Sequence, residues 1–184
     1  MIYDTVIVTG SVHSGTSMAA GVLIHLGVRT GENKHEYRHE DMDFINAETD
    51  EIKGLFTERN NIYAQWMVKI PTFIRPIITE AANELKSPFF IVSIRNTKDA
   101  LKTKRRSGIV TAADDLFVEF YKDTLKDNIK IARKYPHFIY DFNWARNNPQ
   151  EFVHKIISVL GIKVSAEQIT AACQFIGTGY KTIT

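Results

Sequence analysis

Short apolar segments alternate along this chain with longer segments in which apolar residues recur every three to four positions. The short segments predict buried strands at residues 6–8, 66–69, 89–94 and 138–140. The longer segments carry the period of an α-helix, ~3.6 residues. Because strands and helices alternate, the sequence predicts a three-layer α/β fold. Its central sheet is expected to be mostly parallel, with four or five strands and helices on both faces.

Glycine, proline and polar caps set the predicted helix boundaries. Gly27 and Gly161 are expected to close two helices, and Pro149 stands at a favoured first helical position. Thr111 followed by Asp114 resembles a capping box, and residues 177–181 read as a loop. The predicted helices are residues 16–26, 40–47, 51–63, 73–85, 97–103, 111–134, 149–160 and 165–175. The first of them is apolar nearly all round, so we expect it to be buried.

The amino-acid composition argues against several classes of function and location. The chain has 184 residues, of which 44% are hydrophobic and 24% charged, which suits one domain over residues 1–184. The net charge of +2 favours no nucleic-acid partner, so any anion site must be local. Cys173 is the single cysteine, which excludes a disulfide framework and fits a reducing, cytoplasmic location. The N-terminus lacks the pattern of a signal peptide, and no apolar run reaches the ~18 residues of a membrane helix.

The first candidate site is the segment of residues 10–17, Gly-Ser-Val-His-Ser-Gly-Thr-Ser. It follows a predicted strand and opens a predicted helix, whose unpaired N–H groups and partial positive charge suit a phosphate or another anion. The spacing matches the P-loop pattern Gly-x-x-x-x-Gly-Lys-[Ser/Thr], except that Thr16 stands where the lysine belongs. An ordinary phosphotransferase needs that lysine. The alternative is a plain strand–turn–helix corner.

The second candidate site begins at Arg95, directly after the predicted strand of residues 89–94. Open α/β sheets bind ligands at this end of a strand. Thr103 lies eight residues further on, about two helical turns, so both side chains share a helix face. Residues 104–106 add three positive charges, which are either part of the site or a solvated helix end favoured by the helix dipole.

Together these stretches resemble the P-loop sulfotransferases that use 3′-phosphoadenosine-5′-phosphosulfate (PAPS). The family has a basic residue followed by Ser-Gly-Thr-[Ser/Thr], as in residues 13–17. It also has Arg-Asn/Asp-Pro-x-Asp with a serine eight residues after the arginine, which residues 95–103 resemble with Thr97 in place of the proline and Thr103 in place of the serine. Residues 140–142 and 148–162 are similar to its late strand and closing helix. The resemblance implies a P-loop fold in which Arg95 and Thr103 bind the 3′-phosphate. It also implies that the 5′-phosphosulfate is held by His13, Ser14, Gly15, Thr16 and Ser17.

The same resemblance implies catalytic roles. Residues 31–37 are similar to a stretch of bacterial carbohydrate sulfotransferases whose glutamate is the general base, which points to Glu36, with His35 as the competing residue. His13 stands where the family has a Lys or Arg that contacts the transferring sulfuryl group. A histidine can stabilise charge there as a lysine does only when its ring is protonated. Lys69, at the end of the second strand, could substitute for it. The acceptor is expected to be a hydroxyl or amine of a small molecule or carbohydrate. A sulfuryl group needs no bridging metal, so we expect no dependence on Mg²⁺.

Three alternatives stay open. A small-molecule or nucleotide kinase could use the same P-loop fold, but the missing lysine and the Arg95 and Thr103 pair count against it. A protein that binds PAPS or its product without turnover is favoured by His13. His35 and His39 have the spacing of a metal-binding pair on one helix face, although no third ligand is evident nearby and solvated side chains are the better interpretation. The acceptor and the oligomeric state are left open.

Overall fold

The computed structural model describes residues 2–32, 39, 41–48, 51–70, 78, 81, 83–107 and 113–178. Within these ranges the strands form one sheet in the order β2-β1-β3-β4, with every neighbouring pair parallel. The strands are β1 (Thr5–Thr9), β2 (Trp66–Lys69), β3 (Pro88–Ile94) and β4 (His137–Asp141). The predicted α/β fold with a central parallel sheet is therefore confirmed.

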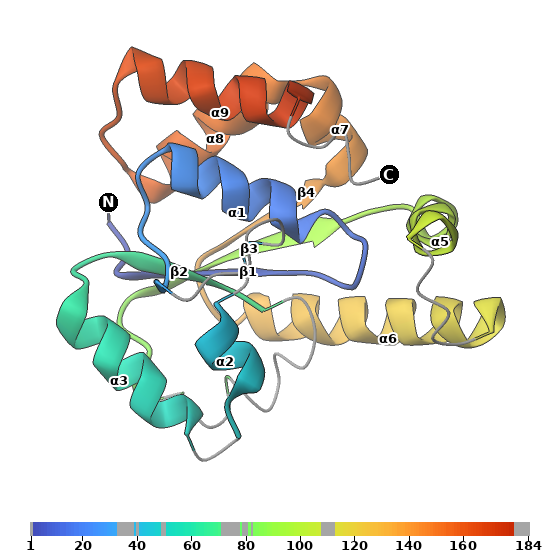
Figure 1. Ribbon diagram of the computed structural model, residues 1–184, viewed down its shortest axis with the longest axis horizontal. Helices are drawn as coiled ribbons and strands as arrows, with labels where there is room; N and C mark the ends of the chain where they lie inside the picture. The colour runs from blue at the N-terminus through green and yellow to red at the C-terminus, as the bar shows by residue number, and fades with distance from the viewer. Residues whose placement is uncertain are drawn as a thin grey trace.

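Helices cover both faces of the sheet (Figure 1). One face is covered by α1 (Thr16–His25), α8 (Pro149–Leu160) and α9 (Ala166–Thr178). The other face is covered by α2 (Met42–Asn46), α3 (Ile52–Ile62) and α6 (Asp114–Ala132). The remaining two described helices, α5 (Thr97–Arg106) and α7 (Phe142–Asn147), follow the carboxyl ends of β3 and β4.

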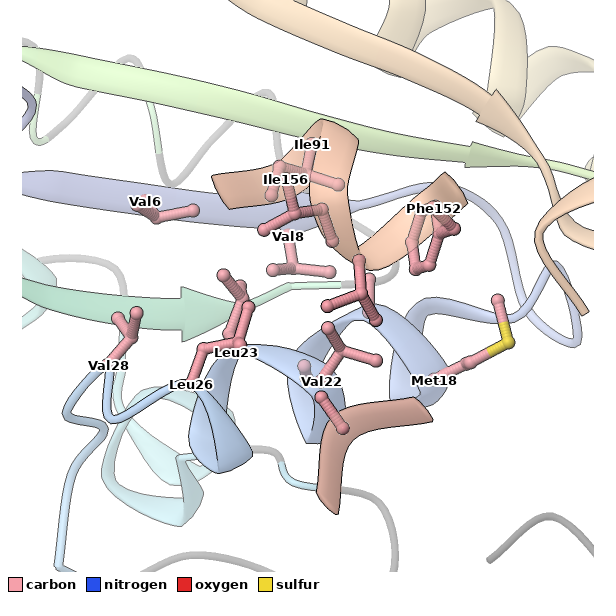
Figure 2. Packing of buried hydrophobic residues seen from close by; sticks show 14 of the residues in the cluster. Val6, Val8, Met18, Val22, Leu23, Leu26, Val28, Ile91, Phe152 and Ile156 are labelled. Carbon is pink, nitrogen blue, oxygen red and sulfur yellow. The ribbon is translucent and has the colours of Figure 1, made fainter. Parts of the chain in front are cut away.

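Alternate residues of each central strand enter two separate cores. Val6 and Val8 pack toward α1, whereas Ile7 packs with Phe56 on the opposite face. Figure 2 shows Val8 and its neighbours meeting the helices of the first core, with Ile156 above them. Because both faces are covered, the strands are apolar at successive positions instead of alternating with polar ones. None of the described helices is long and apolar enough to cross a membrane.

The first helix ends as its glycine predicts. Gly27 has a φ of +86° and donates its N–H to the carbonyl of Ile24 at 2.9 Å, while Val28 donates to Leu23 at 2.9 Å. These two bonds form a Schellman motif, which needs a left-handed residue after the helix. Gly161 closes α8 in the same left-handed region, with a φ of +60°. Both predicted helix stops are confirmed.

Several elements differ from their predicted ranges. Thr111 of the predicted capping box lies outside the described residues, and the described helix α6 starts at Asp114, with Ala113 as its N-cap and no side-chain cap. The sequence pattern did not predict α7, which begins where the Asp141 carboxylate accepts the N–H of Trp144 at 2.9 Å. The predicted loop at residues 177–181 is wrong for its first two residues, since α9 continues to Thr178. Most of the predicted helix at residues 73–85 lies outside the described residues.

Candidate functional site

The two predicted halves of the site meet at the carboxyl edge of the sheet. The chain passes from β1 to β2 on one side and from β3 to β4 on the other, so the switch point lies between the adjacent strands β1 and β3. Open α/β sheets bind ligands in the crevice outside this point. The loop of residues 10–15 leaves β1 here, and Arg95 follows β3 here. In Figure 1 the loop before α1 and the turn before α5 lie at the same end of the sheet.

The glycines of the loop stand where other side chains do not fit. A Cβ on Gly10 would lie 2.7 Å from the carbonyl oxygen of Ser93. Gly15 is the N-cap of α1 with a φ of +104°, and a Cβ there would lie 2.8 Å from two carbons of the Phe142 ring. Close packing and a left-handed backbone therefore both require glycine at residue 15.

Side chains from other parts of the fold hold four carbonyl oxygens of the loop. Each of the four accepts a hydrogen bond from a distant donor: Gly10 from Asn128, His13 from Arg95 at 3.2 Å, Ser14 from Ser93 at 2.7 Å, and Gly15 from Tyr140 at 3.1 Å. The N-terminus of α1 has no side-chain cap and no acidic residue in its first turn. The loop is thus fixed through its carbonyl groups, which leaves the N-terminus of α1 suited to binding an anion.

Lys69 supplies a positive charge beside the start of α1. Its ammonium donates to the hydroxyl of Ser17 at 2.9 Å, and the residue is only 2% exposed. A strand neighbouring β1 therefore brings a lysine to a loop whose own sequence has Thr16 in the lysine position. His13 is half-buried with a φ of +60°, and its ring centroid lies 6.2 Å from that of Phe117. The catalytic roles of Lys69 and His13 stay predictions.

Arg95 and Thr103 lie together, as their spacing predicts. The Nη1 of Arg95 donates to the hydroxyl of Thr103 at 3.1 Å, and that hydroxyl donates to the carbonyl of Asp99 at 3.1 Å. The hydroxyl of Tyr121 donates to the carbonyl of Arg95 at 2.9 Å. Burial raises the pKa of Tyr121 to about 12, so this donor keeps its proton at any physiological pH.

The three basic residues after Thr103 differ from one another. Lys104 is 6% exposed and lies 5.2 Å from the centroid of the Phe117 ring, so it does not belong to a solvated helix end. Its ammonium is 3.4 Å from the carboxylate of Asp114. The exposed Arg105 also pairs with Asp114, and its hydrogen bond lowers the pKa of that carboxyl. Two of the three charges therefore join α5 to the start of α6.

Two predicted site residues lie outside the described part of the chain, and three residues that support the loop or Arg95 were not predicted. Glu36 and His35 lie outside the described residues, so the general base and the paired role of His39 stay predictions. The sequence pattern did not indicate Ser93, Asn128 or Phe142 as site residues. Asn128 carried a usable signal, because it is a polar residue seven positions after Tyr121 on the inner face of a helix.

Comparisons with known proteins support the fold. No family model matches the sequence, and no curated protein matches it. Solved structures do match. Mouse sulfotransferase SULT7A1 complexed with PAP is 12% identical, with a TM-score of 0.65 over 98% of this chain and 68% of that one. The sulfotransferase domain from the curacin biosynthetic pathway is 14% identical, with a TM-score of 0.61 over 93% and 78%.

A sugar kinase from Janibacter sp. HTCC2649, solved without ligand, is also similar. It is 14% identical, with a TM-score of 0.54 over 91% of this chain and 98% of that one. Sulfotransferases and a kinase thus share the arrangement of this chain, a central parallel sheet flanked by helices. At such identities the likeness concerns the fold alone, and the function has to be argued from the site.

Proposed function

We propose that this chain is a transferase that moves a sulfuryl group from PAPS to a hydroxyl or amine of a small-molecule or carbohydrate acceptor. The observation that carries the proposal is the position of Arg95. Its Nη1 lies 3.2 Å from the carbonyl oxygen of His13 and 3.1 Å from the hydroxyl of Thr103. One guanidinium group therefore contacts both the loop and Thr103, its expected partner in binding a second phosphate. A donor nucleotide with anionic groups at its 5′ and 3′ positions fits such a site.

The described residues divide into two anion-binding groups. The amides at the start of α1, from Gly15 to Ser17, would hold the 5′-phosphosulfate, helped by the dipole of the helix. Arg95 and Thr103 would hold the 3′-phosphate, and a hydrogen bond to a charged group there contributes about 1.5–3 kcal/mol. This second group distinguishes a 3′-phosphorylated nucleotide from ATP, which has no 3′-phosphate.

The transfer step gives the charged residues their roles. The acceptor oxygen or nitrogen forms a bond to sulfur while the bond from sulfur to the bridging oxygen breaks, and the acceptor proton passes to a base, for which Glu36 and His35 are the candidates. Negative charge collects on the departing phosphate oxygen. The Lys69 ammonium and the start of α1 would stabilise that charge, as would a protonated His13.

The contact between Lys69 and Ser17 favours this reaction over a kinase reaction. Ser17 stands in the P-loop position whose hydroxyl binds Mg²⁺ in phosphotransferases. Here that hydroxyl accepts a hydrogen bond from the Lys69 ammonium at 2.9 Å. A divalent cation on Ser17 would be repelled by the adjacent positive charge. The kinase alternative, supported by the similarity to a sugar kinase fold, therefore ranks second.

Calorimetric titration of adenosine 3′,5′-bisphosphate against ATP·Mg²⁺ tests the proposal. Wild type should bind the bisphosphate at micromolar Kd and in preference to ATP·Mg²⁺, and Arg95→Ala should weaken it by about tenfold or more. Arg105→Ala is the matched control, because it removes an arginine of α5, the helix that follows Arg95, and this arginine pairs with Asp114. Preference for ATP·Mg²⁺, or equal affinity in Arg95→Ala, would favour the kinase alternative. Binding of PAPS without transfer of its sulfuryl group to any acceptor, and so without release of the bisphosphate, would favour a non-catalytic binding protein.

A further inference from the structure

Phe142 lies between the two anion-binding groups and contacts both. It is the first residue of α7 and is 2% exposed. The guanidinium carbon of Arg95 lies 4.4 Å from the centroid of its ring. On the loop side, the ring occupies the space that a Cβ on Gly15 would need. One aromatic side chain thus packs against the N-cap of α1 and against the guanidinium group that contacts Thr103.

The elements around Phe142 fix its position. The hydroxyl of Tyr140, two residues earlier on β4, donates to the carbonyl of Gly15 at 3.1 Å. Asp141 caps α7 through the N–H of Trp144. Asn143 donates to the carboxylate of Asp99 at 3.1 Å, which joins α7 to α5. The ring is therefore held by its own strand and helix, so it can act as a fixed surface for its two neighbours.

We propose that Phe142 is a positioning residue that couples the loop to Arg95. With the ring in place, Gly15 keeps its left-handed backbone and the guanidinium group keeps one face supported by the ring. Its Nη1 then points at once toward the loop and toward Thr103. The proposal rests on the proposed function for its ligand, a nucleotide with phosphate groups at both ends. The two ends of that ligand then bind to a single preorganised unit.

A double-mutant cycle in bisphosphate affinity tests the coupling. Phe142→Leu should weaken the affinity for adenosine 3′,5′-bisphosphate by about tenfold or more. Arg95→Ala should have a smaller effect in the Phe142→Leu background than in wild type, because residues that act as a unit are not additive. Phe56→Leu is the control: Phe56 is equally buried, but it packs with Phe44 and Trp66 in the other core. It should lower stability and leave affinity within twofold. Additive effects, or an equal loss of affinity in Phe56→Leu, would overturn the proposal.

A second readout separates this proposal from the proposed function. Hydrogen exchange of the Ser14 and Met18 amides, which donate to the carbonyls of Ser11 and Gly15 at 3.1 and 3.0 Å, should become faster in Phe142→Leu and stay unchanged in Phe56→Leu, as followed by NMR without ligand. Unchanged exchange in Phe142→Leu would contradict the positioning role. If wild type binds no bisphosphate, the proposed function fails while the exchange result still decides whether Phe142 fixes the loop. Phe142→Met is the second variant should Phe142→Leu fail to fold.

Discussion

Gly15 occupies a backbone position that a larger residue can reach only with strain. Its φ is +104°, and the Phe142 ring fills the space in which a Cβ would lie. Lys69 is equally constrained, since its charge is almost fully buried and its ammonium is directed at Ser17. Burying a charge is unfavourable unless polar groups compensate it, and the hydroxyl of Ser17 supplies one such group.

We expect Gly15→Ala to lower the free energy of unfolding by about 2 kcal/mol or more, because backbone strain and overlap with the ring add. It should also abolish binding of the bisphosphate. Gly54→Ala is the control within a helix: a Cβ there meets nothing within 4 Å, so the variant should gain about 0.5–1 kcal/mol. Urea unfolding and calorimetry measure both effects. A Gly15→Ala variant as stable as wild type would contradict the described loop geometry.

Lys69→Met should affect both stability and turnover. Methionine keeps the length of the buried side chain but loses the hydrogen bond to Ser17, so the free energy of unfolding is expected to fall by about 1.5–3 kcal/mol. Turnover with PAPS should fall roughly a hundredfold, because the charge that stabilises the departing oxygen is lost. Lys104→Met, at a buried lysine that pairs with Asp114 at the start of α6, should leave turnover within a few-fold. Equal rates in Lys69→Met and wild type would remove Lys69 from the mechanism.

At the scale of elements, the site depends on how α5, α6 and α7 are joined behind it. Arg105 and Lys104 of α5 pair with Asp114 at the start of α6. On the other side, Asn143 of α7 donates to Asp99 of α5, and this hydrogen bond lowers the pKa of the Asp99 carboxyl. These links orient α5, the helix that carries Thr103, relative to Phe142.

The link between α5 and α7 has a defined pH dependence. The pKa of Asp99 is lower in the folded chain than in the unfolded chain. The stabilisation is therefore present above the unfolded value and is lost as pH falls through the folded value. Asn143→Ala should raise the pKa of Asp99 toward its ordinary value, as measured by NMR titration of the carboxyl carbon. Asn147→Ala, an exposed asparagine on the same helix, is the control and should leave it unchanged. A titration curve unaltered by Asn143→Ala would show that the bond does not form.

At the scale of the molecule, one sheet separates two cores and gathers the site at one edge. Residues from β1, β2, β3, β4 and α6 all contribute to the loop or to its support, which requires the two cores to keep the strands aligned. Trp66 lies in the core beside α3, and Trp144 packs against the core beside α8. The two tryptophans thus report on opposite faces of the same sheet.

We expect the chain to unfold in a single transition, which would establish the predicted single domain over residues 1–184. Trp144→Phe leaves fluorescence from Trp66 alone, and Trp66→Phe leaves it from Trp144 alone, since the chain has two tryptophans. Within each variant, the urea midpoint from fluorescence should coincide with that from far-UV circular dichroism. Separate midpoints would mean that the two cores fold independently.

The local elements of this fold could be predicted from the sequence because their signals are local. Apolar runs located each strand in the described part of the chain, and glycine located the ends of α1 and α8, since backbone freedom is a property of the residue itself. The start of α6 and the existence of α7 were missed. The start of α6 has no side-chain cap to mark it, and α7 is a six-residue helix that begins at the Asp141 cap, so local propensity is a weak guide to both.

The sequence by itself also determined which chemical groups are present: a loop suited to binding an anion, and an arginine and a threonine about two helical turns apart. Only the tertiary structure decided which groups meet. Arg95 reaches the carbonyl of His13 across 82 positions of sequence, and Lys69 reaches Ser17 across 52. Such contacts follow from the order of the strands, which is fixed by the crossover connections and by burial on both faces of the sheet. No local pattern carries that order. The sequence indicated Lys69 as a candidate, but its contact with Ser17 and the position of Phe142 beside Gly15 became visible only in the folded chain.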